Sequence, residues 1–135
     1  MEKEIIVVSD TNVFIDLYSI GLLKAFFSLP WEVHTTDLVM FELKRQWQNE
    51  EVSQYETKGL LYIPSLSEKE MQVIVNMMIN SSRDTNVSLA DCSVWYYARE
   101  NNYIVLITDS PSQKSIFESK NGAAVFKYGG HENAH

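Results

Sequence analysis

Residues 5–12 read Ile-Ile-Val-Val-Ser-Asp-Thr-Asn, and this stretch decides the fold. Its first four residues are β-branched without polar alternation, which is typical of a strand buried on both faces of a sheet. The polar residues that follow end the strand. From Val13 the apolar residues recur every three to four positions, which predicts a helix that ends near Phe27 or Ser28. The stretch therefore begins a strand-helix unit.

The same alternation of strand and helix continues along the chain. Ser67 and Glu70 form a capping box, which marks the start of another helix. Because parallel strands need helical crossovers, this pattern predicts a three-layer α/β/α sandwich with a central parallel sheet of about five strands. We expect one domain over residues 1–128 and a flexible C-terminal tail over 129–135. Further strands are predicted over 31–35, 60–63, 103–108 and 123–126, and further helices from Asp37, over Leu89–Glu100 and from Ser110-Pro111.

Composition limits the kind of protein this is. The 135 residues are 45% hydrophobic, which suits one folded domain, and the formal net charge is −7. The apolar runs are far shorter than the roughly 18 residues of a membrane span, and the N-terminus has no signal-peptide pattern, so a cytoplasmic protein is expected. Cys92 is the single cysteine, which excludes an internal disulfide. The acidic balance argues against long-range attraction of nucleic acid.

Acidic residues stand at the expected ligand-binding edge of the sheet. Asp10 and Asp109 each follow a predicted strand directly, while Glu42 and Asp91 lie near helix starts. Ligands of such sheets bind outside the carboxyl ends of the strands, so we expect these four carboxylates to converge. Carboxylates gathered in one cleft repel each other unless a hard cation such as Mg²⁺ or Mn²⁺ lies between them.

These residues resemble the PIN domain family over nearly the whole chain. The resemblance rests on Asp10-Thr11-Asn12-Val13 after a strand, Glu42 in a helix, Leu89-Ala90-Asp91 at a helix start, and Thr108-Asp109 after a strand. The size is most similar to that of VapC-like toxin ribonucleases of type II toxin-antitoxin systems.

The resemblance implies an Mg²⁺- or Mn²⁺-dependent endoribonuclease. It places Asp10, Glu42, Asp91 and Asp109 at the family's catalytic, metal-binding positions, with Asn12 and Thr108 as supporting polar residues. The expected partners are an RNA substrate, an antitoxin protein and a second copy of the chain in a homodimer. No membrane association is expected. Candidates for contacts to RNA phosphates are Lys44, Arg45, Lys114, Lys120 and Lys127.

Each acidic residue also has an ordinary structural interpretation. Asp10 can cap the helix that follows it, and Asp91 can form a capping box with Ser88. Glu42 can pair with Arg45 on the helix surface. Asp16 and Asp37 are interpreted as structural, Cys92 as a small buried residue, and the Trp95-Tyr96-Tyr97 cluster as core or dimer interface.

Two other functions remain open from the sequence. One is an inactive PIN-like scaffold for protein contacts, because Ser110-Pro111-Ser112 follows Asp109 where many PIN domains carry a further acid. The other is a phosphatase of the haloacid dehalogenase type, in which Asp10 would be the nucleophile. The later motifs of such a phosphatase are not found in the chain. Self-association or antitoxin binding is expected at the apolar residues Met71, Val75 and Met78 or at Trp95 and Tyr96.

Overall fold

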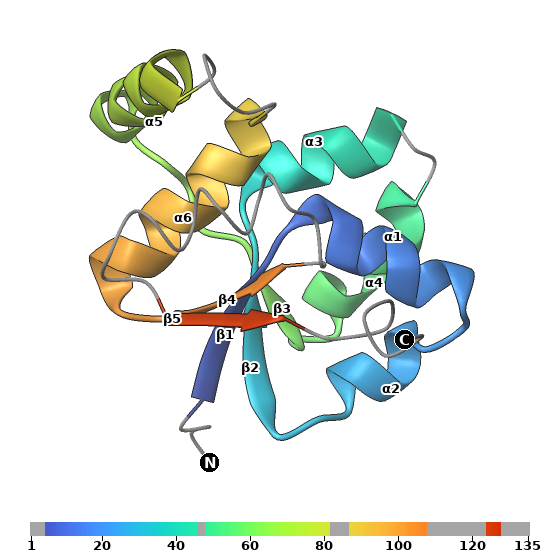
Figure 1. Ribbon diagram of the computed structural model, residues 1–135. Coiled ribbons are helices and arrows are strands. Elements are labelled where there is room, and N and C mark those ends of the chain that lie inside the picture. The colour runs from blue at the N-terminus through green and yellow to red at the C-terminus, as the bar shows by residue number, and fades with distance from the viewer. Residues whose placement is uncertain (1–4, 46–47, 82–86, 108–123, 128–135) are drawn as a thin grey trace, which may run out of the picture.

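The strand β1 (Ile5–Ser9) lies at the centre of a five-stranded sheet (Figure 1). The computed structural model describes residues 5–45, 48–81, 87–107 and 124–127. The strand order is β3-β2-β1-β4-β5 and every neighbouring pair is parallel, which confirms the predicted fold class. The remaining strands are β2 (Trp31–His34), β3 (Leu61–Tyr62), β4 (Ile104–Ile107) and β5 (Ala124–Lys127).

Helices cover both faces of this sheet (Figure 1). The helices α1, α2 and α4 lie on one face, and α6 lies on the other with α5 packed against it. The helix α3 contacts both α1 and α6. Their bounds are α1 (Thr11–Ser19), α2 (Leu23–Phe27), α3 (Asp37–Arg45), α4 (Asn49–Thr57), α5 (Glu68–Ser81) and α6 (Leu89–Asn101).

The single helix predicted from Val13 to about Ser28 is wrong, because the structure divides it into α1 and α2. Gly21 adopts a positive φ of 74°, which few residues other than glycine tolerate. The amide of Leu22 donates to the Leu17 carbonyl and that of Gly21 to the Tyr18 carbonyl. These two hydrogen bonds form a Schellman motif, which ends α1 within the range of the predicted helix.

Other boundaries differ for local reasons. The helix α4 was not predicted, because Val52 and Tyr55 are its only buried residues and two positions do not define a helical period. The strand β3 is shorter than predicted. Both predicted capping boxes are present, Ser67 with Glu70 and Ser88 with Asp91. The helix predicted from Ser110 and the tail over 129–135 lie outside the described residues.

The main core contains buried residues of the sheet and of the helices α1, α2, α3, α4 and α6. Phe27 stacks on Tyr55 with ring centroids 4.1 Å apart and also on Phe14. A second, smaller cluster between α5 and α6 contains Ile74 and Cys92, so Cys92 is buried as predicted. Trp95 is only 2% exposed, which makes the expectation of a docking surface at Trp95 wrong. Within the part of the chain that the structure describes, no helix has the length and apolar character needed to cross a membrane.

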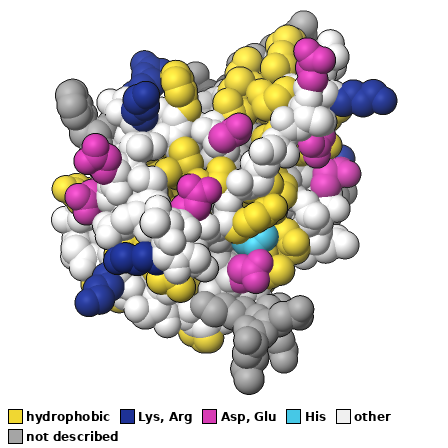
Figure 2. Space-filling view, turned by 180° about the vertical axis from the view of Figure 1, so that it is seen from behind, with side chains coloured by type: hydrophobic (Ala, Val, Ile, Leu, Met, Phe, Trp, Pro, Cys, Tyr) yellow, Lys and Arg dark blue, Asp and Glu magenta, His cyan; other side chains and the backbone are white. Residues whose placement is uncertain are grey.

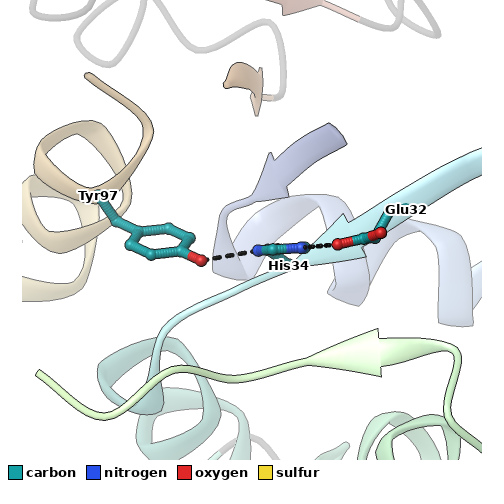
Figure 3. Close-up of polar contacts among 3 residues, drawn as sticks. All are labelled: Glu32, His34 and Tyr97. Atoms are coloured by element: carbon teal, nitrogen blue, oxygen red, sulfur yellow. Dashed lines mark hydrogen bonds and ion pairs between the residues drawn. The ribbon is translucent and has the colours of Figure 1, made fainter. Parts of the chain in front are cut away.

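A hydrogen-bonded chain that is buried at His34 and Tyr97 joins β2 to α6. His34 Nδ1 lies 2.7 Å from the Tyr97 hydroxyl, and Nε2 lies 2.6 Å from a carboxylate oxygen of Glu32 (Figure 3). All three groups are satisfied when Tyr97 donates to Nδ1 and Nε2–H donates to Glu32. The pKa of Tyr97 is raised, mainly by burial and next by the nearby Tyr103. The Tyr97 hydroxyl therefore stays protonated and can donate a hydrogen bond. The contact fixes α6 over the sheet.

We predict that Tyr97→Phe lowers the free energy of unfolding at neutral pH by about 1–2 kcal/mol, because buried His34 Nδ1 then lacks its donor. Tyr103→Phe is the matched control, since Tyr103 packs edge-on against the same imidazole with its ring. Urea denaturation measures both, and the control should change by less than about 0.5 kcal/mol. Equal losses in the two variants would show that the hydrogen bond from Tyr97 to His34 does not stabilise the fold.

The pH dependence gives a second readout of the same contact. The unfolded chain ionises its tyrosines near pH 10, while the raised pKa of Tyr97 keeps that hydroxyl protonated in the folded chain. The contribution of Tyr97 to stability is therefore complete below pH 10 and is lost as the pH rises further. Tyr97→Phe should flatten this decline.

Candidate active site

Asp10 lies at the carboxyl end of the central strand and is completely buried. It is the N-cap of α1, because its backbone is extended and Oδ1 accepts a hydrogen bond of 2.9 Å from the Val13 amide. This contact confirms the capping interpretation of Asp10 and explains why α1 begins at Thr11 rather than at Val13. A carboxylate in this position is held rigidly by the strand before it and the helix after it.

Glu42 is hydrogen-bonded to Thr11, the residue that follows Asp10 in the sequence. The Thr11 hydroxyl donates a hydrogen bond of 2.7 Å to Glu42 Oε1, which links α1 to α3 and brings Glu42 beside the segment that carries Asp10. Glu42 forms no ion pair with Arg45 among the described residues, so the helix-surface interpretation of Glu42 is wrong. Sequence analysis missed Thr11 as a site residue, and only its place directly after Asp10 in a polar turn could have suggested it.

Hydroxyl groups hold the elements around the candidate site against one another: the end of β2 against the end of β1, and the start of α3 against α6. Thr35 donates to the Ser9 carbonyl at 2.8 Å, which ties the end of β2 to the residue before Asp10. The Thr36 hydroxyl lies 2.7 Å from that of Ser93 and also accepts from the Val39 amide. Thr36 therefore starts α3 and holds it against α6. Because all these groups are buried, the bonds position α3 and α6 closely.

Asp91 lies on the first turn of α6 and is 9% exposed. One of its carboxylate oxygens accepts from the Ser88 amide at 3.2 Å, and its own amide donates to the Ser88 hydroxyl at 3.0 Å. The capping interpretation of Asp91 is thus confirmed. A capping carboxylate still has lone pairs for other partners, so this role is compatible with metal binding. The helix α6 packs against α3, which carries Glu42, and against β1, which Asp10 directly follows.

Two of the predicted site residues, Asp10 and Glu42, are joined in the structure through adjacent Thr11. Exposed Asn12 and half-buried Glu42 line one cavity of about 200 Å³. Thr108 and Asp109 lie outside the described residues, although β4, which precedes them, is paired with β1. Among described residues, no group of three or more His, Cys, Asp or Glu side chains is close enough to hold a metal ion.

The donor atoms of the site fit a hard divalent cation in their chemistry. Buried Asp10 and the oriented Glu42 offer oxygen atoms, which Mg²⁺ and Mn²⁺ prefer. Mg²⁺ keeps several of its waters and needs only one or two protein carboxylates. The cavity beside Glu42 is open to solvent.

Solved structures show the same fold at low sequence identity. VapBC2 from Rickettsia felis, crystallised with a DNA fragment from its promoter, has 12% identity and a TM-score of 0.54, with 91% of this chain and 98% of that chain covered. PAE2754 from Pyrobaculum aerophilum has 10% identity and a TM-score of 0.58, with 90% of each chain covered. No curated protein matches the chain in sequence.

A family model described as a PIN domain matches residues 6–121. The matched range contains all four predicted acidic residues, and the match is to this family rather than to a phosphatase of the haloacid dehalogenase type. The family match and the sheet order agree with the resemblance seen in the sequence. The chain belongs to the PIN domain family.

Proposed function

We propose that the chain is an endoribonuclease that requires Mg²⁺ or Mn²⁺ and acts as the toxin of a toxin-antitoxin pair. The observation that supports the proposal is the hydrogen bond from Thr11 to Glu42, which links Glu42 on α3 to the residue that directly follows buried Asp10 in a PIN-domain chain. The similarity in fold to VapBC2 supports the toxin assignment.

The proposed ligands of the cation are Asp10, Glu42, Asp91 and Asp109. A divalent ion bound there supplies positive charge for the phosphate and lowers the pKa of an attacking water. Asp10 orients the site because its position is fixed by β1 and α1. Glu42 has more rotatable bonds, and the Thr11 hydroxyl limits its freedom. Asn12, exposed beside them, offers an amide to the substrate, and Thr108 is proposed to support Asp109.

RNA is the proposed substrate despite the net charge of −7. An empty group of carboxylates repels RNA, whereas a bound cation offsets that charge at the point where the phosphate must lie. Local basic residues then matter more than overall charge. A thin basic surface favours recognition of RNA by shape and a few contacts.

Protein partners are proposed on two surfaces. The acidic charge fits an antitoxin with an apolar helix and an Arg or Lys that reaches the carboxylates. Hydrophobic side chains gather over α5 on the surface shown in Figure 2. Among the residues of α5, Val73 and Ile79 are exposed. This patch, which half-buried Met71, Val75 and Met78 extend, is the proposed contact of a homodimer.

We predict that the purified chain cleaves RNA with Mg²⁺ or Mn²⁺ and that EDTA abolishes cleavage. Asp10→Asn should lower the rate by at least about a hundredfold, because a rigid anionic ligand becomes neutral. Asp16→Asn is the matched control, since it removes an equal charge from the same helix and should cleave normally. Gel analysis of a labelled RNA measures all three. Cleavage that survives EDTA, or equal rates in both variants, would overturn the proposal.

We also predict that Thr11→Val raises the metal concentration needed for half-maximal cleavage by about tenfold, because Glu42 loses its hydrogen-bond donor. Thr11→Ser keeps the hydroxyl and should restore nearly normal metal dependence. Cleavage assays over a range of Mn²⁺ concentrations compare the two. If valine and serine behave alike, the hydroxyl does not position Glu42.

A further inference from the structure

A small polar cavity lies beside the proposed catalytic carboxylates, between the start of α1 and the end of α3. It has a volume of about 200 Å³ and is lined by Thr11, Asn12, Ile15, Glu42 and Arg45. Glu42 and Arg45 are one helical turn apart, so their side chains reach the same side of α3. The cavity thus places one cation next to one carboxylate of the site.

The volume limits what this cavity can hold. Pockets for whole small-molecule ligands usually measure about 300–1,000 Å³, so a space of about 200 Å³ fits one group of a larger substrate. The lining offers a guanidinium, an exposed amide and a half-buried apolar side chain, Ile15. A guanidinium binds phosphate oxygens in pairs, an amide donates to them, and an apolar wall suits the carbon face of a sugar.

We propose that this cavity binds a phosphodiester of the RNA strand next to the bond that is cut, and that Arg45 is its main contact. The proposal rests on the ribonuclease function above and deepens it by naming a substrate-binding residue. Arg45 touches no reacting atom in this scheme, so it governs the binding of RNA rather than the chemical step.

Arg45 is a cation that lines this cavity, and its surroundings differ from those of Arg99 and Lys58. Arg99 pairs with Glu100 and lies over Trp95, and Lys58 contacts Gln54 and the ring of Tyr55. Arg45 forms no hydrogen bond or ion pair within the described ranges, and its side chain is exposed. Neighbouring Lys44, the other candidate phosphate contact on α3, is also exposed but does not line the cavity, so we assign the contact to Arg45 alone.

Charge balance explains why one arginine should have a large effect. Thr11 holds the Glu42 carboxylate in the cavity wall, where it repels a phosphate. Arg45 offsets that charge from one helical turn away. Without Arg45 an incoming phosphodiester would meet Glu42 alone, and binding would weaken by more than the loss of a single surface charge.

The test is the binding of a short fluorescein-labelled single-stranded RNA to the full chain in EDTA, followed by fluorescence anisotropy. We expect Arg45→Gln to weaken binding about tenfold and to reduce the slope of log K against log salt by about 0.7. Lys44→Gln is the matched control, because it removes the same charge from the adjacent position, and it should stay within about twofold. Arg45→Lys should recover part of the affinity. With Mn²⁺ present, Arg45→Gln should raise KM and leave kcat nearly unchanged.

The outcomes separate this proposal from the ribonuclease proposal. If the chain never cleaves RNA but Arg45→Gln weakens RNA binding selectively, the subsite stands and the nuclease function fails. If cleavage occurs and Arg45→Gln leaves Kd and KM unchanged, the subsite fails and the nuclease function stands. Equal weakening by Lys44→Gln, or no measurable RNA binding by the unaltered chain in either EDTA or Mn²⁺, overturns the subsite.

Discussion

The carboxylate of Asp10 is buried completely at the carboxyl end of the central strand, and the rest of the site is arranged around it. Burying a carboxylate is unfavourable unless hydrogen bonds or a cation stabilise its charge. The Val13 amide supplies one such bond and begins α1 at the same time. One residue therefore ends β1, starts α1 and presents an anionic group to the edge where parallel sheets bind their ligands.

The neighbouring strands and helices are held at this point by hydroxyl groups that are distant in sequence. Thr35 bonds Ser9 across 26 positions, Thr11 bonds Glu42 across 31, and Thr36 bonds Ser93 across 57. Buried bonds of this kind tolerate little displacement, because a broken one leaves an unsatisfied polar group. The three links orient the helices that carry Glu42 and Asp91. The site is thus a property of the whole fold.

Local patterns in the sequence were sufficient to predict the features that depend on neighbouring residues. The β-branched run of β1 and the capping box of Ser88 with Asp91 act within a few positions, and both were predicted correctly. The division of α1 from α2 also has a local cause, Gly21, but its effect was missed because the apolar period continues past it. By contrast, the partner of Glu42 could not be predicted. Arg45 is close in sequence, whereas Thr11 is brought there only by packing of α3 on α1.

Buried Asp10 is proposed to anchor a site for a divalent cation. Calorimetric titration of Mn²⁺ into the purified chain tests this proposal directly. We predict measurable binding by the unaltered chain and a loss of more than about tenfold in affinity for Asp10→Asn. Asp37→Asn removes the same charge from an exposed position at the start of α3 and should bind as the unaltered chain does. Absence of binding by the unaltered chain, or equal binding by Asp10→Asn, would contradict the account and would favour a PIN-domain scaffold that only contacts other proteins.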